Sequence, residues 1–162
     1  MSTNTTYETL PASTRVWIYQ SNDVLPEGEI PLIKAKIQQF AERWVSHNRQ
    51  LRAYGDILHN RFLVLMVDES QAGASGCSID SSVAFVKSLQ AEYQVDFFDR
   101  MRFSFKQGDK VLTLSRDEFA KWYQEGRIGD DTLVFDTLVK DKAAFEAAFE
   151  KPLAESWHAR MV

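Results

Sequence analysis

The sequence predicts an α+β fold in which helices pack on an antiparallel or mixed sheet. Two observations lead to this class. Short segments rich in β-branched and aromatic residues alternate along the chain with longer segments whose apolar residues recur every three or four positions. The 162 residues are 44% hydrophobic, which is enough for one compact domain or for one domain with a small appendage.

The first strand and the first helix are predicted from their different periods. Residues 15–20 are β-rich, with Val16 and its alternate neighbours on one face and Trp17 on the other. Residues 29–47 repeat apolar side chains, such as Ile33 and Ile37, on one face of a 3.6-residue period. A strand followed by an amphipathic helix is therefore expected here.

Two further strands are expected next in the chain, over residues 51–58 and 61–67. The dipeptide His59-Asn60 between them is a plausible hairpin turn, although it lacks the favoured glycine. Residues 61–67 are almost entirely apolar, which is typical of a central strand covered on both faces.

A second helix over residues 79–93, with Ser78 as its N-cap, leads to a fourth strand over residues 101–106. The order up to this point is strand, helix, strand, strand, helix, strand. This order is the split-βαβ, ferredoxin-like pattern, whose antiparallel sheet carries both helices on one face.

The remainder of the chain reads as a short strand–helix–strand followed by a helix. Ser115 and Glu118 are spaced as a capping box at the start of its first helix. The predicted elements are residues 111–114, 116–125, 132–135 and 140–150.

Three parts of the chain are expected. Residues 1–13 are polar and predict a mobile tail. Residues 14–106 would form the ferredoxin-like core, and residues 107–162 a C-terminal extension packed with it as one unit.

Composition narrows the classes of function. The net charge of −4 argues against broad electrostatic binding to nucleic acid or to anionic membranes. The longest apolar run, residues 62–67, is far too short to cross a bilayer. The single cysteine rules out an internal disulfide, and the polar start lacks the pattern of a signal peptide, so the cytoplasm is the expected location.

Residues 62–69, an apolar strand ending in Asp68-Glu69, have the form of a Walker B segment, in which carboxylates hold magnesium and orient water. The pattern is common, however, and a buried strand that emerges into a polar loop is the favoured interpretation. The chain contains no Gly-x-x-x-x-Gly-Lys-Ser/Thr segment to cradle phosphates, so ATPase activity is not expected. No cofactor and no metal site is predicted.

The loop at residues 73–78 (GASGCS) is the one chemically suggestive segment. Small residues before a helix expose several amides, which suit a phosphate or carboxylate, and the same geometry would activate the thiol of Cys77. Alternatively, the two glycines only permit a tight turn and Cys77 is buried as a small apolar residue. The candidate ligand-binding residues are Asp68, Glu69, Gly73, Ser75, Gly76, Cys77, Ser78 and Asp80, with Cys77 as the only catalytic candidate.

Several segments resemble a family of short bacterial proteins that commonly carry an ABC-transporter ATPase label. The similar segments are WIYQSN (17–22), NRFLVLMVDE (60–69), GASGCSIDSSV (73–83), DFFDRMR (96–102), DTLVFDTLV (131–139) and SWHARMV (156–162). They span nearly the whole chain, but the resemblance implies no particular activity. The label implies a Walker A segment, which this sequence lacks.

Residues 111–135 loosely resemble the back half of GYF-type modules, which bind proline-rich peptides. The Gly-Pro-aromatic segment of those modules is replaced here by residues 107–110 (QGDK), so no binding residue is carried over.

Three functional hypotheses remain open from the sequence. The first is a non-catalytic interaction or ligand-binding domain whose partner is an unknown protein or a small anionic ligand. In this hypothesis the domain could also form a homodimer. The second is a phosphate or nucleotide binder that uses the 73–78 loop. The third is an enzyme or redox protein that depends on Cys77.

Overall fold

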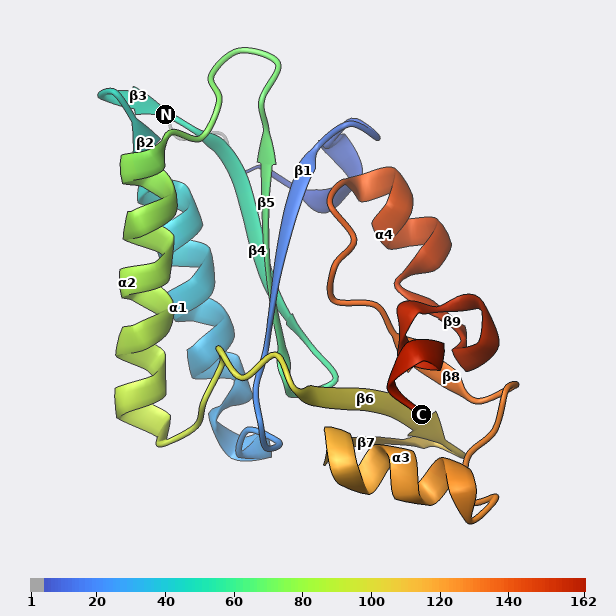
Figure 1. Cartoon of the computed structure of the whole chain (residues 1–162). Coiled ribbons are helices and arrows are strands. Elements are labelled where there is room, and N and C mark those ends of the chain that lie inside the picture. Colours follow the sequence, from blue (N-terminus) through green and yellow to red (C-terminus); the bar gives the residue numbers. More distant parts are fainter. Residues whose placement is uncertain (1–4) are drawn as a thin grey trace.

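A computed structural model describes residues 5–162 and confirms the α+β class. Three sheets and four α-helices are present among these residues, joined by short 3₁₀ helices (Figure 1). The elements are η1 (Tyr7–Thr9), β1 (Arg15–Gln20), η2 (Glu27–Glu29), α1 (Ile30–Arg43), β2 (Val45–Ser46), β3 (Arg49–Gln50), β4 (Arg52–Leu58), β5 (Phe62–Asp68), α2 (Gly76–Tyr93), β6 (Arg102–Gln107), β7 (Lys110–Ser115), α3 (Arg116–Gln124), β8 (Leu133–Phe135), α4 (Lys142–Ala148), β9 (Glu150–Pro152), η3 (Leu153–Glu155) and η4 (Trp157–Met161).

The first sheet has the strand order β1-β5-β4, with every neighbouring pair antiparallel. All seven residues of β5 are buried, as predicted for a central strand covered on both faces. The turn between β4 and β5 is closed by His59 and Asn60, which both have positive φ, the geometry of a type I′ hairpin turn.

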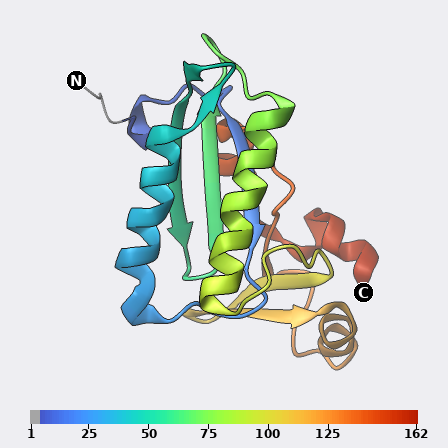
Figure 2. The same ribbon diagram turned by 90° about the vertical axis from the view of Figure 1, so that its left-hand side faces the viewer.

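Helices α1 and α2 lie side by side on one face of this sheet (Figure 2). Helix α1 ends at Arg43, earlier than predicted, because the chain turns back in the small β2–β3 hairpin. His47 and Asn48 make that turn with positive φ. The apolar face of α1, which includes Ile33 and Ile37, is buried against the sheet as its period indicates.

The opposite face of the same sheet is covered by residues from the far end of the chain. Phe135, Val139 and Phe149 pack against β5 side chains such as Phe62 and Val64. Within the expected N-terminal tail, η1 is formed and the side chain of Leu10 is buried in this cluster, whereas residues 1–4 lie outside the described part of the chain.

The second sheet, with the order β7-β6-β8-β9, holds the strand that was expected to complete the ferredoxin-like sheet. β6 therefore does not pair with β1. Its buried Phe103 and Phe105 pack instead against Phe119 of α3 and other apolar residues near the C-terminus. The aromatic side chains of β6 thus find a separate core, which explains why this strand leaves the first sheet.

The two sheets meet at Gln20, the last residue of β1. Its side-chain Nε2 donates to the carbonyl of Arg102 at 2.9 Å, and its Oε1 accepts from the Ser104 hydroxyl at 2.7 Å. Since Ser104 is fully buried, both ends of the Gln20 amide are satisfied inside the protein. This contact fixes where β6 begins relative to the end of β1.

Candidate functional site

The acidic end of β5 is held by contacts inside its own loop. The Asp68 carboxylate is buried, accepts from the Ser70 N–H at 3.0 Å and pairs with Arg52 at 3.3 Å. The Ser70 N–H is the largest influence on the pKa of Asp68, which lies below its usual value despite desolvation. Asp68 thus serves as a turn residue, and this part of the Walker B-like segment matches the structural alternative.

Three of the six amides in the 73–78 loop already have partners. The Glu69 carboxylate accepts from the Ala74 N–H at 2.9 Å, and the hydroxyls of Ser75 and Ser78 accept from each other's backbone N–H. Ser75, rather than Ser78, is therefore the N-cap, and α2 begins three residues earlier than predicted, at Gly76. The Glu69 carboxylate thus takes one of the amides that an anion could use, and anion binding by this loop stays a prediction.

The remaining candidates lie around the first turn of α2. Gly73 faces Glu69, since a Cβ added there would lie 3.0 Å from the carboxylate oxygen. Gly76, Cys77 and Asp80 are exposed, so Cys77 is not the buried apolar residue of the structural alternative. The thiol of Cys77 is accessible, but accessibility alone does not make it a nucleophile.

No hydrogen bond or ion pair joins a histidine to the Cys77 thiol among the described residues. His59 lies in the β4–β5 turn, at the opposite end of the seven-residue β5, about 23 Å along the strand. His158 is 1% exposed, and no hydrogen bond or ion pair joins His47 to Cys77 within residues 5–162. Over the same residues, no group of three or more His, Cys, Asp or Glu side chains is arranged to hold a metal ion.

A groove that the sequence did not indicate runs along the outer edge of β1. We call it the β1 groove. Its volume is about 1130 Å³, and it lies between α2 on one side and the C-terminal segment on the other (Figure 1). It is lined by all of β1, by Ile79, Val83 and Lys87 of α2, by residues 97–100 and 102, by residues 137–140, and by Trp157 and Met161.

The walls of the β1 groove are largely apolar. Ile79, Val83 and Lys87 follow one another at intervals of four residues, so they form a single row along α2. Leu138 is 57% exposed on the other wall, which makes it the most exposed large apolar side chain in the described chain. Together with Trp157, it gives the groove an apolar surface open to ligands.

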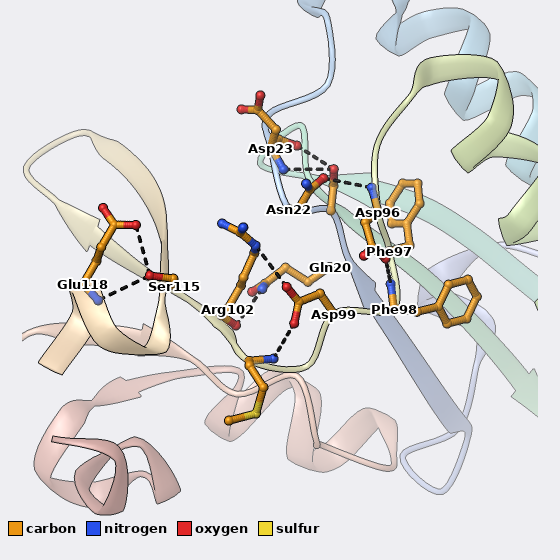
Figure 3. A network of polar contacts seen from close by, with 12 residues as sticks. Gln20, Asn22, Asp23, Asp96, Phe97, Phe98, Asp99, Arg102, Ser115 and Glu118 are labelled. Carbon is orange, nitrogen blue, oxygen red and sulfur yellow. Dashed lines mark hydrogen bonds and ion pairs between the residues drawn. The ribbon is translucent and has the colours of Figure 1, made fainter.

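The open rim of the groove is held in place by a short polar network. Asn22 fixes the chain at Asp96, donating from its own N–H to the Asp96 carbonyl and accepting the Asp96 N–H with its side chain, both at 2.8 Å. Figure 3 shows the next contacts: the Asp99 carboxylate accepts from the Met101 N–H at 3.0 Å and from Arg102 Nε at 3.1 Å. The rim is thus preorganised by its own backbone and side chains.

Aromatic contacts place two further side chains at the groove. Phe98 stands edge-on to the Tyr19 ring, with centroids 5.6 Å apart. The Arg15 guanidinium lies over the Trp17 ring, 4.5 Å from its centroid, so its charge stays close to an aromatic surface. Both pairs present aromatic faces along the floor formed by β1.

Basic side chains dominate the charge of the groove. The lining includes a single acidic residue, Asp99, which pairs with Arg102. Lys87, Arg100 and Lys140 form no ion pair with any described residue. The basic lining residues are Arg15, Lys87, Arg100, Arg102 and Lys140.

A buried polar cluster supports the Trp157 wall from behind. The indole N–H of Trp157 donates to the Asp136 carboxylate at 2.9 Å, and Lys151 donates to the same carboxylate at 2.7 Å. Burial raises the pKa of Asp136, but these hydrogen bonds outweigh it, and the pKa lies below its usual value.

Next to this cluster, the Ser156 hydroxyl lies 2.6 Å from Nδ1 of His158. Both side chains are buried, so this pair has a structural role.

No protein-family model, curated protein or solved structure matches the chain in the comparisons made. Among residues 5–162, no helix has both the length and the apolar character needed to cross a membrane. The geometry of the groove is therefore the main guide to function.

Proposed function

We propose that this chain is a non-catalytic binding domain whose ligand, an anionic molecule with an apolar portion, occupies the β1 groove. The observation that carries the proposal is the charge of the lining. Five of its residues are basic and one is acidic, although the whole chain has 19 Lys and Arg against 23 Asp and Glu. A basic groove on an acidic protein concentrates anions at one place.

The ion pairs inside the groove strengthen the argument. Arg102 is already paired with Asp99, and Arg15 with Glu69. Lys87, Arg100 and Lys140 have no acidic partner among the described residues. Three cations in a partly apolar groove are thus available to an incoming carboxylate, phosphate or sulfonate. The apolar walls would bury the rest of the ligand.

The non-catalytic part of the proposal rests on the side chains that line the groove. The described lining contains no His, Cys, Ser or Glu, and its one Asp is bonded to Arg102 and to a backbone N–H. Among the described residues, no hydrogen bond joins the Tyr, Thr or Lys side chains of the lining to a base, as an activated nucleophile would need. Binding is the chemistry that these residues support best.

The test uses anilinonaphthalene sulfonate, which combines aromatic rings with one negative charge and fluoresces when it is bound. We expect saturable binding that weakens at least tenfold in the double variant Lys87→Glu, Arg100→Glu. The control is Lys110→Glu, Lys121→Glu, which makes the same change in net charge at exposed positions outside the groove. Equal affinities of the two double variants for the dye would refute the proposal.

A further inference from the structure

We propose, resting on the function proposed above, that the ligand of the β1 groove is an extended polypeptide segment with carboxylate side chains, which adds to β1 as a new edge strand. The first argument is the backbone of β1. Its outer edge already forms two bonds of an antiparallel ladder: the Val16 N–H donates to the Lys140 carbonyl at 2.9 Å, and the Lys142 N–H donates to the Thr14 carbonyl at 2.8 Å.

The ladder stops after these two bonds. The Lys140 N–H would be next along the facing segment, but it makes no bond to the Val16 carbonyl among the described residues. Two residues further, the Leu138 N–H donates to the Asp136 side chain at 2.9 Å. Backbone N–H groups alternate between the two edges of a strand, so those of Ile18 and Gln20 point to the same outer edge as that of Val16. Within residues 5–162, neither amide has a partner outside the sheet.

An edge with unpaired N–H and C=O groups is a template for another strand. The free stretch from Trp17 to Gln20 is about 13 Å long. An added strand would lie about 4.8 Å from β1, in the position that the fourth strand of a ferredoxin-like sheet would take and that β6 leaves open. Figure 1 shows β1 at the edge of the sheet, with α2 on one side and the C-terminal segment on the other.

The size of the groove favours a polypeptide over a small metabolite. Its volume of about 1130 Å³ is larger than the range of about 300–1,000 Å³ that is typical of sites for drug-sized ligands. Every residue of β1 lines it, so the site extends along the whole strand.

The walls suggest which side chains the added strand carries. Successive residues of a strand point to opposite faces, so one set would meet the α2 row of Ile79, Val83 and Lys87. The other set would meet the wall that contains Leu138 and Trp157. With its carboxylates toward Lys87 of α2 and its apolar residues toward Leu138 and Trp157, a strand that alternates the two kinds of residue would match the groove.

The probe is a blocked synthetic heptapeptide of alternating glutamate and valine, compared with the same design in which lysine replaces glutamate. We expect the glutamate peptide to bind at least tenfold more tightly, as measured by isothermal titration calorimetry. In ¹⁵N-labelled protein, hydrogen exchange of the Ile18 and Gln20 amides should slow at least tenfold at saturation. Two further peptides carry N-methyl groups on the odd or on the even residues, which blocks one edge at a time. One of these two should lose at least tenfold in affinity, while the other binds as the parent does.

The outcomes separate this inference from the function on which it rests. If both methylated peptides bind as tightly as the parent, strand addition is refuted, while the charge-dependent dye binding still supports an anion groove. If reversal of Lys87 and Arg100 changes neither dye nor peptide affinity, the proposed function itself fails. If the free protein sediments as a dimer and its Ile18 amide is already protected, a second copy occupies the edge and the inference is wrong.

Discussion

Protonation of His158 should make the stability of this protein fall between pH 7 and pH 5. The imidazole is 1% exposed, stacks on the Trp157 ring with centroids 3.7 Å apart and stands edge-on to Phe103. Burial among these rings lowers the pKa of His158 from 6.5 to about 4, against the opposing influence of Asp136. The native protein therefore holds this side chain neutral at pH 5.

The free energy of unfolding falls at low pH because the folded and unfolded chains bind the His158 proton at different pH values. Above pH 6.5 the imidazole is neutral in both the folded and the unfolded chain, so it causes no loss of stability. As the pH falls below 6.5, the unfolded chain binds a proton that the folded chain does not bind until about pH 4. The free energy of unfolding should thus decrease by about 2 kcal/mol between pH 7 and pH 5 through His158 alone.

Urea denaturation at closely spaced pH values measures this loss, with His158→Gln as the variant that cannot titrate. The difference in unfolding free energy between wild type and variant should shrink by about 2 kcal/mol between pH 7 and pH 5. His59, whose pKa is also lowered by burial, remains in both proteins, and its share cancels. Parallel pH profiles of the two proteins would refute the reasoning, as would an NMR titration that places the pKa of His158 in the folded protein at or above 6.5. The NMR measurement does not depend on the variant being folded.

Three further predictions concern packing, each measured by urea denaturation followed by circular dichroism. Gly55→Ala should lower the unfolding free energy by about 1–3 kcal/mol, because the added Cβ would lie 2.5 Å from Ile37 Cγ2. The control is Gly28→Ala, where the added Cβ meets open space. Equal stability of the two variants would contradict this prediction. Lys142→Met should lower the unfolding free energy by about 2 kcal/mol, since the buried ammonium donates to two backbone carbonyls of the N-terminal segment. An unfolding free energy equal to that of the wild type would argue against it. Phe149→Ala should lower the unfolding free energy by about 3–5 kcal/mol, and the variant should still unfold in one cooperative transition. The reason is that the Phe149 ring packs in a core shared by both ends of the chain. Two separate transitions would show that the parts fold independently.

The elements of the first sheet were predictable because their patterns are local. The uninterrupted apolar run from Phe62 predicted a central strand, and the structure buries that strand completely.

The cap of α3 was predictable in the same way. The spacing of Ser115 and Glu118 predicted it, and the Ser115 hydroxyl does accept the Glu118 N–H. In the structure the Glu118 carboxylate accepts from that hydroxyl rather than from the backbone.

The partner of β6 was not predictable in the same way. The order of strands and helices up to β6 fits a ferredoxin-like sheet, but a period of two says only that the segment is a strand. Its place is decided by Phe103 and Phe105, whose partners come from α3 and from residues near the C-terminus. The local spacing of apolar residues does not indicate which distant residues a strand packs against.

The β1 groove was missed for a related reason. It exists because one edge of β1 is left unpaired, and its basic residues come from segments far apart in the sequence, such as Arg15, Lys87 and Lys140. The short loop around Cys77 attracted the sequence hypothesis because its residues are consecutive. The structure shows that much of that loop is engaged in its own hydrogen bonds.

The late arrival of the residues that cover one face of the first sheet has a consequence for synthesis on the ribosome. β1, β4 and β5 can pair once Asp68 has emerged, and α2 can then close one face. The other face, with Phe62 and Val64, waits for Phe149, about 80 residues later, which corresponds to roughly 4–16 s of translation. During that interval the nascent chain displays an apolar sheet surface, and it should be a substrate for ribosome-associated chaperones.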